Sequence, residues 1–138
     1  MFPEANRALF CRFVEEVFHR GNLAALEQIF TPDALIHDAG MEIRGPQALR
    51  PAVRSLLTAF PDLRIALEDQ IGEGSRLAVR YRGDGTHCAE WRGIPANGQR
   101  ISYSGMLIVR FESGRIAEYW AQPDMLGLLQ QLGAAPPS

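Results

Sequence analysis

The stretch Ile101–Gln122, ISYSGMLIVRFESGRIAEYWAQ, consists of two long apolar runs on either side of Glu112-Ser113-Gly114. Each run alternates with a period of two, and the glycine stands where a three-residue hairpin loop needs a left-handed residue. The pattern therefore predicts an antiparallel hairpin. The expected pairs are Phe111 with Arg115, Leu107 with Tyr119, and Gly105 with Ala121.

Both faces of this hairpin are apolar. The odd-numbered face carries Tyr103, Leu107 and Tyr119, and we expect it to line a pocket beneath the helices. Helices can cover only one side of such a sheet, so the other side is predicted to meet a second subunit in a homodimer. That even-numbered face is assigned Met106, Ile108, Ile116 and Trp120, with Arg110 and Glu118 close enough to pair across the strands.

The chain before the hairpin supplies two more strands. Leu63, Ile65 and Leu67 alternate with charged residues, and Gly72-Glu73-Gly74 is expected to turn this strand into a second one. That second strand contains Leu77, Val79 and Tyr81. With Ile101–Gln122, these strands form a predicted antiparallel meander.

The first half of the chain has the period of amphipathic helices instead. The apolar spacing predicts a helix from Pro3 to His19. A second helix is expected after an Asn22 N-cap, and a third from Pro46 to Phe60. A final helix is predicted over Met125–Leu132, followed by a frayed tail over Ala134–Ser138. Helices followed by strands predict an α+β fold.

Composition narrows the class of protein. The 138 residues suit one domain, here taken as residues 1–138, and the net charge of -2 is spread along the chain. No basic face suited to nucleic acid stands out, and no apolar run is long enough for a membrane span. No secretory segment precedes the domain, so a cytoplasmic protein is expected. All 14 basic residues are arginine, which excludes a lysine Schiff base.

The cysteines and histidines give no metal-binding spacing. Cys11 and Cys88 are interpreted as buried free thiols, and His19 as a favourable charge at the end of an exposed helix. The three histidines contain no His-x-His or Glu-x-x-His pattern, so we predict no metal. The sequence also lacks a phosphate-binding or dinucleotide motif, so no cofactor is expected.

The stretch 85–100, GTHCAEWRGIPANGQR, is the most specific signal in the chain. It resembles the G-T-H-x-G-E-x-x-G-I-P-P-T-G-K-x segment of the SnoaL-like polyketide cyclases and ester cyclases, a branch of the nuclear transport factor two-like superfamily. Residues 13–18, 60–63 and 110–120 match in the same order, as do Asp124 and residues 131–133. The resemblance implies a cone-shaped barrel, made of a strongly curved antiparallel sheet packed on helices around a deep apolar cavity.

The resemblance also implies a chemistry, with one departure. Founding members of the family close the last ring of polyketide antibiotics by an intramolecular aldol reaction, without metal or organic cofactor. Their acid/base aspartate stands three residues before the column of Asp124, and a histidine stands on the neighbouring strand. Here these columns hold Ala121 and Leu107, which cannot exchange a proton. The mechanism therefore does not carry over residue by residue.

Three residues remain as candidates for catalysis. Asp124 is a possible replacement acid beside Trp120, or the N-cap of the last helix. His37 either faces the cavity mouth or is a solvated loop residue. His87 either orients a substrate oxygen or makes a structural hydrogen bond that fixes the long loop before Trp91.

Five residues are candidates for substrate binding. Tyr103 and Tyr119 carry phenols that can donate to a carbonyl or an enolate. Trp91, Leu107 and Trp120 are expected to form apolar parts of the pocket wall. The sequence therefore favours an enzyme that uses general acid/base catalysis on a polyketide-like or polycyclic substrate, as a cyclase or isomerase. The alternatives are a non-catalytic module that binds an apolar ligand, and a hydrolase or hydroxylase on the same fold.

Overall fold

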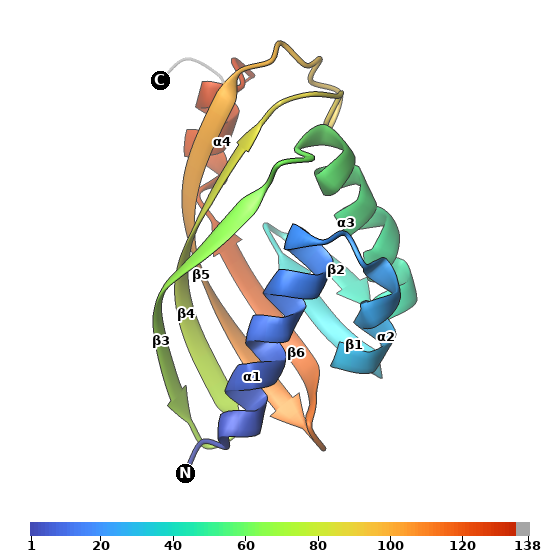
Figure 1. Cartoon of the computed structure of the whole chain (residues 1–138), viewed down its shortest axis with the longest axis vertical. Coiled ribbons are helices and arrows are strands. Elements are labelled where there is room, and N and C mark those ends of the chain that lie inside the picture. Colours follow the sequence, from blue (N-terminus) through green and yellow to red (C-terminus); the bar gives the residue numbers. More distant parts are fainter. Residues whose placement is uncertain (135–138) are drawn as a thin grey trace.

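The computed structural model describes residues 1–134 and shows a strongly curved sheet with helices on its concave face (Figure 1). The sheet has six strands in the order β2-β1-β6-β5-β4-β3. This arrangement confirms the predicted α+β class. The strands are β1 (Phe30–Asp38), β2 (Met41–Arg44), β3 (Arg64–Glu73), β4 (Arg76–Thr86), β5 (Arg100–Glu112) and β6 (Arg115–Pro123).

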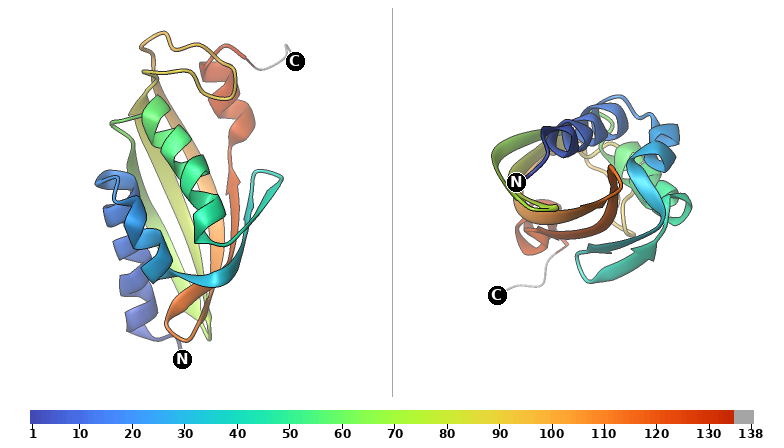
Figure 2. Two further views of the ribbon diagram at one scale, coloured as in Figure 1. Left: turned by 90° about the vertical axis from the view of Figure 1, so that its right-hand side faces the viewer. Right: turned by 90° about the horizontal axis from the view of Figure 1, so that it is seen from below.

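The sheet curls like a half-open cylinder, and helices lie along its open side (Figure 2). Its edge strands β2 and β3 do not pair, so the barrel is not closed. Strands β3 to β6 form the predicted antiparallel meander. The expectation of a wholly antiparallel sheet was wrong at one place, because β1 runs parallel to β6. After β1 the chain runs through β2 and the helix at Pro46–Ala59 to the far edge of the sheet, and this connection makes the parallel pairing possible.

The helices form where their apolar spacing predicts them. The first comprises α1 (Glu4–Arg12) and a π-helical segment, η1 (Phe13–His19). A short 3-10 turn, η2 (Leu23–Ala25), leads into α2 (Leu26–Ile29). The other two are α3 (Pro46–Ala59), with proline in its first turn, and α4 (Met125–Gln131). The predicted tail at Ala134–Ser138 lies almost wholly outside the described residues.

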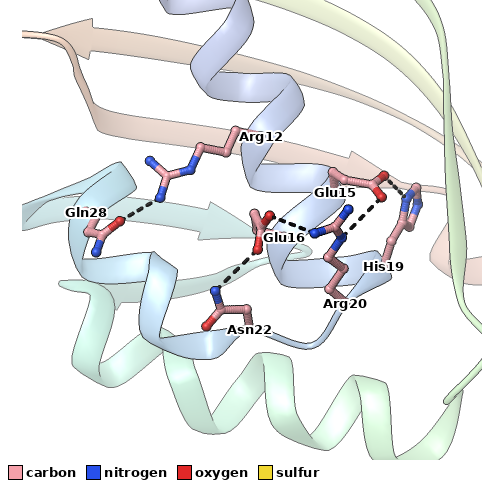
Figure 3. Close-up of polar contacts among 7 residues, drawn as sticks. All are labelled: Arg12, Glu15, Glu16, His19, Arg20, Asn22 and Gln28. Carbon is pink, nitrogen blue, oxygen red and sulfur yellow. Dashed lines mark hydrogen bonds and ion pairs between the residues drawn. The ribbon is translucent and has the colours of Figure 1, made fainter.

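A polar network holds the corner between the first helix and α2 (Figure 3). Glu16 contacts Arg20 at 3.5 Å and accepts a hydrogen bond from the Asn22 side chain at 3.3 Å. Asn22 occupies the predicted N-cap position, but its side chain makes no capping hydrogen bond and its amide donates to Glu16 instead. Arg12 donates to Gln28 at 2.6 Å across the corner. These contacts fix the angle at which the chain returns towards the sheet.

His19 belongs to this corner but has a different role from the one predicted. Its side chain is only 13% exposed. Its Nε2 accepts a hydrogen bond from the Ile65 backbone N–H at 2.9 Å, and its Nδ1 lies 2.9 Å from Glu15 Oε2. Nε2 therefore serves as a hydrogen-bond acceptor for the edge strand, a contact that the sequence pattern did not predict. His19 thus attaches the first helix to the edge strand β3.

The β5–β6 hairpin has a shorter loop than predicted. Ser113 and Gly114 form a two-residue turn with φ of 52° and 78°, a left-handed pair that matches the twist of the strands. Leu107 therefore pairs with Ala121 rather than with Tyr119. Gly105 pairs with Pro123, Val109 with Tyr119, and Glu112 with Arg115. The pairing is shifted by two residues along most of the hairpin, so each residue there keeps its predicted face.

A β-bulge at Ala117 corrects one further assignment. Phe111 pairs with Ile116, whereas the preceding Arg110 pairs with Glu118, so Ala117 is the extra residue. The bulge turns Ile116 inward, where it is fully buried, and not onto the outer face as predicted. The predicted Arg110–Glu118 contact is present at 3.5 Å.

Two other local predictions were wrong. The turn between β3 and β4 falls at Gly74-Ser75, and Gly72 lies inside β3. Glycine is needed at position 72 for packing rather than for a turn, because a Cβ there would stand 2.5 Å from the Phe2 ring.

Cys11 and Cys88 are both exposed, not buried. The loop geometry after β4 and the outer side of α1 leave both thiols at the surface.

Candidate active site

A cavity of about 290 Å³ lies between the concave face of the sheet and the helices. The helices contribute aromatic and aliphatic side chains to its wall, including Phe10, Phe18 and Leu49. The sheet contributes Tyr81, Tyr103, Leu107, Tyr119 and Ala121. The odd-numbered face of the hairpin therefore lines a hollow beneath the helices, and the space is open for a small molecule.

Two tyrosines are held flat against the cavity wall by glycines on the neighbouring strand. Tyr81 of β4 pairs with Gly105 of β5, and Tyr103 of β5 pairs with Gly83 of β4. A Cβ at Gly105 would stand 2.5 Å from the Tyr81 hydroxyl, and one at Gly83 would stand 2.8 Å from the Tyr103 hydroxyl. Each ring thus occupies the space that a side chain opposite would fill. The two rings meet edge to face at 6.4 Å.

The cavity keeps its phenols protonated. Burial, followed by the neighbouring Asp38 charge, raises the pKa of Tyr103 to about 12. Burial also raises the pKa of Tyr81 and of Tyr119, with smaller contributions from neighbouring tyrosines and from Asp38. At neutral pH all three hydroxyls can therefore donate hydrogen bonds to a carbonyl or enolate oxygen.

Asp38 is the only carboxylate among the described residues that line this cavity. It is the last residue of β1, and in the parallel ladder it pairs with Ala121 of β6. Burial raises the pKa of the Asp38 carboxyl above its ordinary value of 3.8, and the Arg92 charge partly offsets this effect. A desolvated carboxyl beside several phenols is a suitable general acid or base.

The loop between β4 and β5 lies at the same end of the molecule as α4 and the C-terminal end of α3 (Figure 1). Trp91 and Arg92 of this loop both line the cavity. Trp91 is buried, and its ring packs edge to face on Phe60 at 5.6 Å. The structure thus places Trp91, Tyr103, Leu107 and Tyr119 together in one lining, and their role in binding a substrate stays a prediction.

His37 and Trp120 lie elsewhere, on the outer face of the sheet. His37 Nε2 is 2.9 Å from Glu118 Oε2, and its ring stacks on Trp120 at 5.7 Å. The Arg76 guanidinium lies over the Trp120 ring, 5.7 Å from its centroid. Trp120 also lines a shallow outer hollow with Met106 and is not in the lining of the inner cavity.

His87 and Asp124 are also outside the cavity lining. His87 is 1% exposed and stacks on Phe60 at 5.2 Å. Its backbone N–H donates to the Gln99 carbonyl at 2.9 Å, which fixes the two ends of the loop. Asp124 is exposed, and its side chain accepts a hydrogen bond from the Gly127 N–H at 2.9 Å as the N-cap of α4. The Asp124 contact fits the structural interpretation, whereas the loop bond at His87 comes from its backbone, and within residues 1–134 the buried Nε2 of its imidazole has no hydrogen-bond partner.

Sequence reasoning missed Asp38, Arg92 and Tyr81 as site residues. A signal for Asp38 was available, since alternate residues of a strand face opposite sides. Ile36 and Asp38 share the inner face of β1, so choosing His37 for the cavity excluded its neighbour. Arg92 could not be found this way, because its position depends on the fold of a long loop.

The described residues contain no cluster of three or more His, Cys, Asp or Glu side chains that could hold a metal ion. Over the same residues, none of the helices combines the length and apolarity that crossing a membrane requires.

Comparison with known proteins gives a consistent result. Aklanonic acid methyl ester cyclase DauD from Streptomyces sp. strain C5 is 33% identical over 111 residues, which are 78% of this chain and 66%, just under two thirds, of DauD. Aklanonic acid methyl ester cyclase DnrD from Streptomyces peucetius is 33% identical over 77% of this chain and 72% of DnrD.

Solved structures show the same fold. TsrD from Streptomyces laurentii superposes with a TM-score of 0.86 at 29% identity, over 97% of this chain and 98% of TsrD. AclR from Streptomyces galilaeus, a proposed hydroxylase, superposes with a TM-score of 0.84 at 28% identity, over 95% and 97% of the two chains. The family model described as SnoaL-like polyketide cyclase matches residues 8–132. With the cavity at the expected place and nearly the whole domain matched, the chain belongs to the SnoaL-like polyketide cyclase family.

Proposed function

We propose that this protein is an enzyme of polyketide metabolism that catalyses ring closure by general acid/base catalysis, with Asp38 as the proton-transferring group. The observation that supports this most directly is a desolvated carboxylate, the only one among the described lining residues, in an apolar cavity lined by protonated tyrosines. The names of the relatives DauD and DnrD suggest the substrate class, a polycyclic polyketide ester.

The chemistry needs only proton transfers and the electrons of the substrate. Asp38 removes a proton from the carbon next to a carbonyl, and a tyrosine hydroxyl donates a hydrogen bond to the oxygen that becomes an enolate. The enolate carbon then attacks a second carbonyl of the same molecule and forms the new carbon–carbon bond. The protonated Asp38 returns its proton to the alkoxide. Tyr103 and Tyr119 are the proposed donors.

The position of Asp38 explains how the site functions with alanine at 121. The family resemblance places the acid/base group on β6, in the column of Ala121. Paired residues of a parallel ladder point to the same face, so Asp38 projects into the space next to the Ala121 methyl group. We propose that the carboxylate has this role from the neighbouring strand. His37, His87 and Asp124 take no part in proton transfer in this scheme.

The test is turnover of aklanonic acid methyl ester, followed by liquid chromatography and mass spectrometry. The expected product is an isomer, with the same mass and a new retention time. Asp38→Asn should reduce turnover at least about 100-fold, the usual scale for loss of a general base. Asp124→Asn is the matched control and should retain turnover, since asparagine is also a good N-cap.

Three other outcomes would contradict the proposal. Full activity of Asp38→Asn would remove Asp38 from the mechanism. A product that contains an added oxygen atom would indicate hydroxylation, the activity proposed for AclR. Saturable binding of the ester without any new product would indicate a binding module.

We also propose that the outer face of the sheet is a homodimer interface. Ile71, Met106 and Ile108 are 66%, 61% and 44% exposed, and they surround the hollow next to Trp120. An apolar patch of this kind on a sheet face typically marks an interface. Light scattering should give a dimer mass for the wild type and a monomer mass for Ile108→Glu. A monomeric wild type at micromolar concentration would contradict the assignment.

A further inference from the structure

Arg92 stands at the mouth of the cavity in an uncommon backbone conformation. Trp91 and Ile94 close a tight turn, with reciprocal backbone hydrogen bonds of 3.0 and 2.9 Å. The two central residues, Arg92 and Gly93, have φ of 52° and 78°. Glycine or asparagine is the usual choice for such positions, and another residue in the left-handed region costs on the order of 1 kcal/mol. This cost favours a role for the arginine side chain.

The contacts of the guanidinium leave most of its donors free. It lies over the Trp91 ring, 4.7 Å from the centroid, and Nη2 is 3.8 Å from Met41 Sδ. Within residues 1–134, Arg92 makes no ion pair and no hydrogen bond to an oxygen. A thioether and an aromatic face hold the planar group in place, but they satisfy few of its five N–H donors.

The charge of Arg92 acts on the cavity. It is the only cationic side chain among the described lining residues, and it lowers the pKa of Asp38 against the effect of burial. Asp38 and Arg92 make no direct ion pair, but both neighbour Met41, which pairs with Asp38 in the β1–β2 ladder and lies 3.8 Å from Arg92 Nη2. An anion that enters the cavity mouth meets an arginine with a free planar edge, which is the geometry that binds a carboxylate through two parallel hydrogen bonds.

We propose that Arg92 is a specificity-determining residue that binds an anionic, carboxylate-like oxygen pair on a flat aromatic substrate. The inference rests on the proposed function and revises its substrate class, from the polycyclic polyketide ester that the names of DauD and DnrD suggest to a polycyclic polyketide with a free anionic group at one end. The rings would enter the apolar cavity, and the anionic end would remain at the mouth, between Arg92 and the solvent.

The test uses two probes that differ only in charge, anthraquinone-2-carboxylate and its methyl ester. Binding is measured by quenching of Trp91 fluorescence in a Trp120→Phe background, which leaves the cavity tryptophan as the single reporter. The carboxylate should bind at least about tenfold more tightly than the ester, as expected for one charge-assisted pair. Added salt should reduce this preference, because the mouth is open to solvent.

Variants at two positions make the result specific. Arg92→Gln should abolish the preference by weakening the binding of the carboxylate probe only. Arg92→Lys should retain part of the preference, because lysine keeps the charge but not the planar fork. Asp38→Asn should increase the preference for the carboxylate probe over the ester, since it removes a negative charge that repels the carboxylate.

The outcomes separate this inference from the proposed function. A preference that survives in Arg92→Gln, or an equal loss for both probes, would overturn the role of Arg92 alone. Equal binding of the two probes to the Trp120→Phe protein that retains Arg92 would also overturn the role of Arg92. If neither probe quenches Trp91, the cavity is not a site for flat aromatic ligands, and both proposals fail. If the charge preference behaves as expected but Asp38→Asn keeps full turnover, only the catalytic proposal fails.

Discussion

The pairing of tyrosine with glycine across β4 and β5 gives a sharp prediction for Gly83→Ala. The added Cβ would stand 2.6 Å from Cε1 and Cζ of Tyr103, whereas ordinary contact begins at 3.4 Å. The ring must therefore retreat by about 0.8 Å (3.4 − 2.6), and the free direction is into the cavity. Such overpacking costs about 1–3 kcal/mol, which exceeds the gain of about 0.5–1 kcal/mol from removing a strand glycine.

Gly85→Ala is the matched control, since it lies on the same strand. Its added Cβ would meet Asp62, Phe60 and Leu63 atoms at 3.4 to 3.6 Å, which is ordinary contact. The control should therefore be as stable as the wild type or slightly more so. The two variants should differ by about 2 kcal/mol, or roughly 6–8 °C in Tm for a chain of this size.

The assay is thermal and urea unfolding followed by circular dichroism. A double-mutant cycle identifies the cause, because Tyr103→Ala removes the ring that Gly83→Ala would displace. In that background Gly83→Ala should cost nothing. Equal stability of Gly83→Ala and Gly85→Ala, or an undiminished cost in the Tyr103→Ala background, would refute the packing argument.

Three further predictions concern ionisable side chains. Because burial raises the pKa of Asp38, its ionisation costs more in the folded than in the unfolded chain, so its contribution to stability falls as pH rises from 3.8 through the folded pKa. Urea unfolding at a series of pH values should show this decline in the wild type relative to Asp38→Asn. Asp124→Ala should lower stability by about 0.5–2 kcal/mol through loss of the cap while turnover is unchanged, as checked by unfolding and product assays. Hydrogen bonds from Thr86 lower the pKa of Asp62, so that carboxyl stabilises the fold above pH 3.8 and less so as pH falls through its folded pKa. In Thr86→Val, an NMR titration should find the pKa of Asp62 closer to its ordinary value.

The sequence was sufficient for the architecture because hydrophobic period is a local property. The period near four in the first half of the chain and the period of two after Leu63 correspond to helices and strands in the structure, except that the β1–β2 hairpin at residues 30–44 lies among the helices. Register was less accessible, because it depends on one turn and one bulge. A three-residue loop and the actual two-residue turn at Ser113-Gly114 differ little in sequence, yet they shift the pairing by two residues.

The cavity lining was predicted mainly where it follows from strand parity in the hairpin, with Trp91 of the long loop as the exception. Tyr103, Leu107 and Tyr119 line the cavity because an even shift in pairing leaves each residue on its own face. Strand alternation could have placed Asp38 on the inner face once His37 was placed outside, but nothing local shows that β1 lies parallel to β6. That pairing joins distant parts of the chain, and it alone brings the carboxylate next to Ala121.

The parallel pairing also determines when the binding site can first exist. His37 of β1 and Glu118 of β6 are in contact across 81 positions of sequence, so closing this part of the sheet requires ordering a long intervening segment. During synthesis on the ribosome, the nascent chain has one wall of the cavity long before it has the other. A ligand therefore has nowhere to bind until the last strand has emerged, and cannot assist the earlier steps of folding.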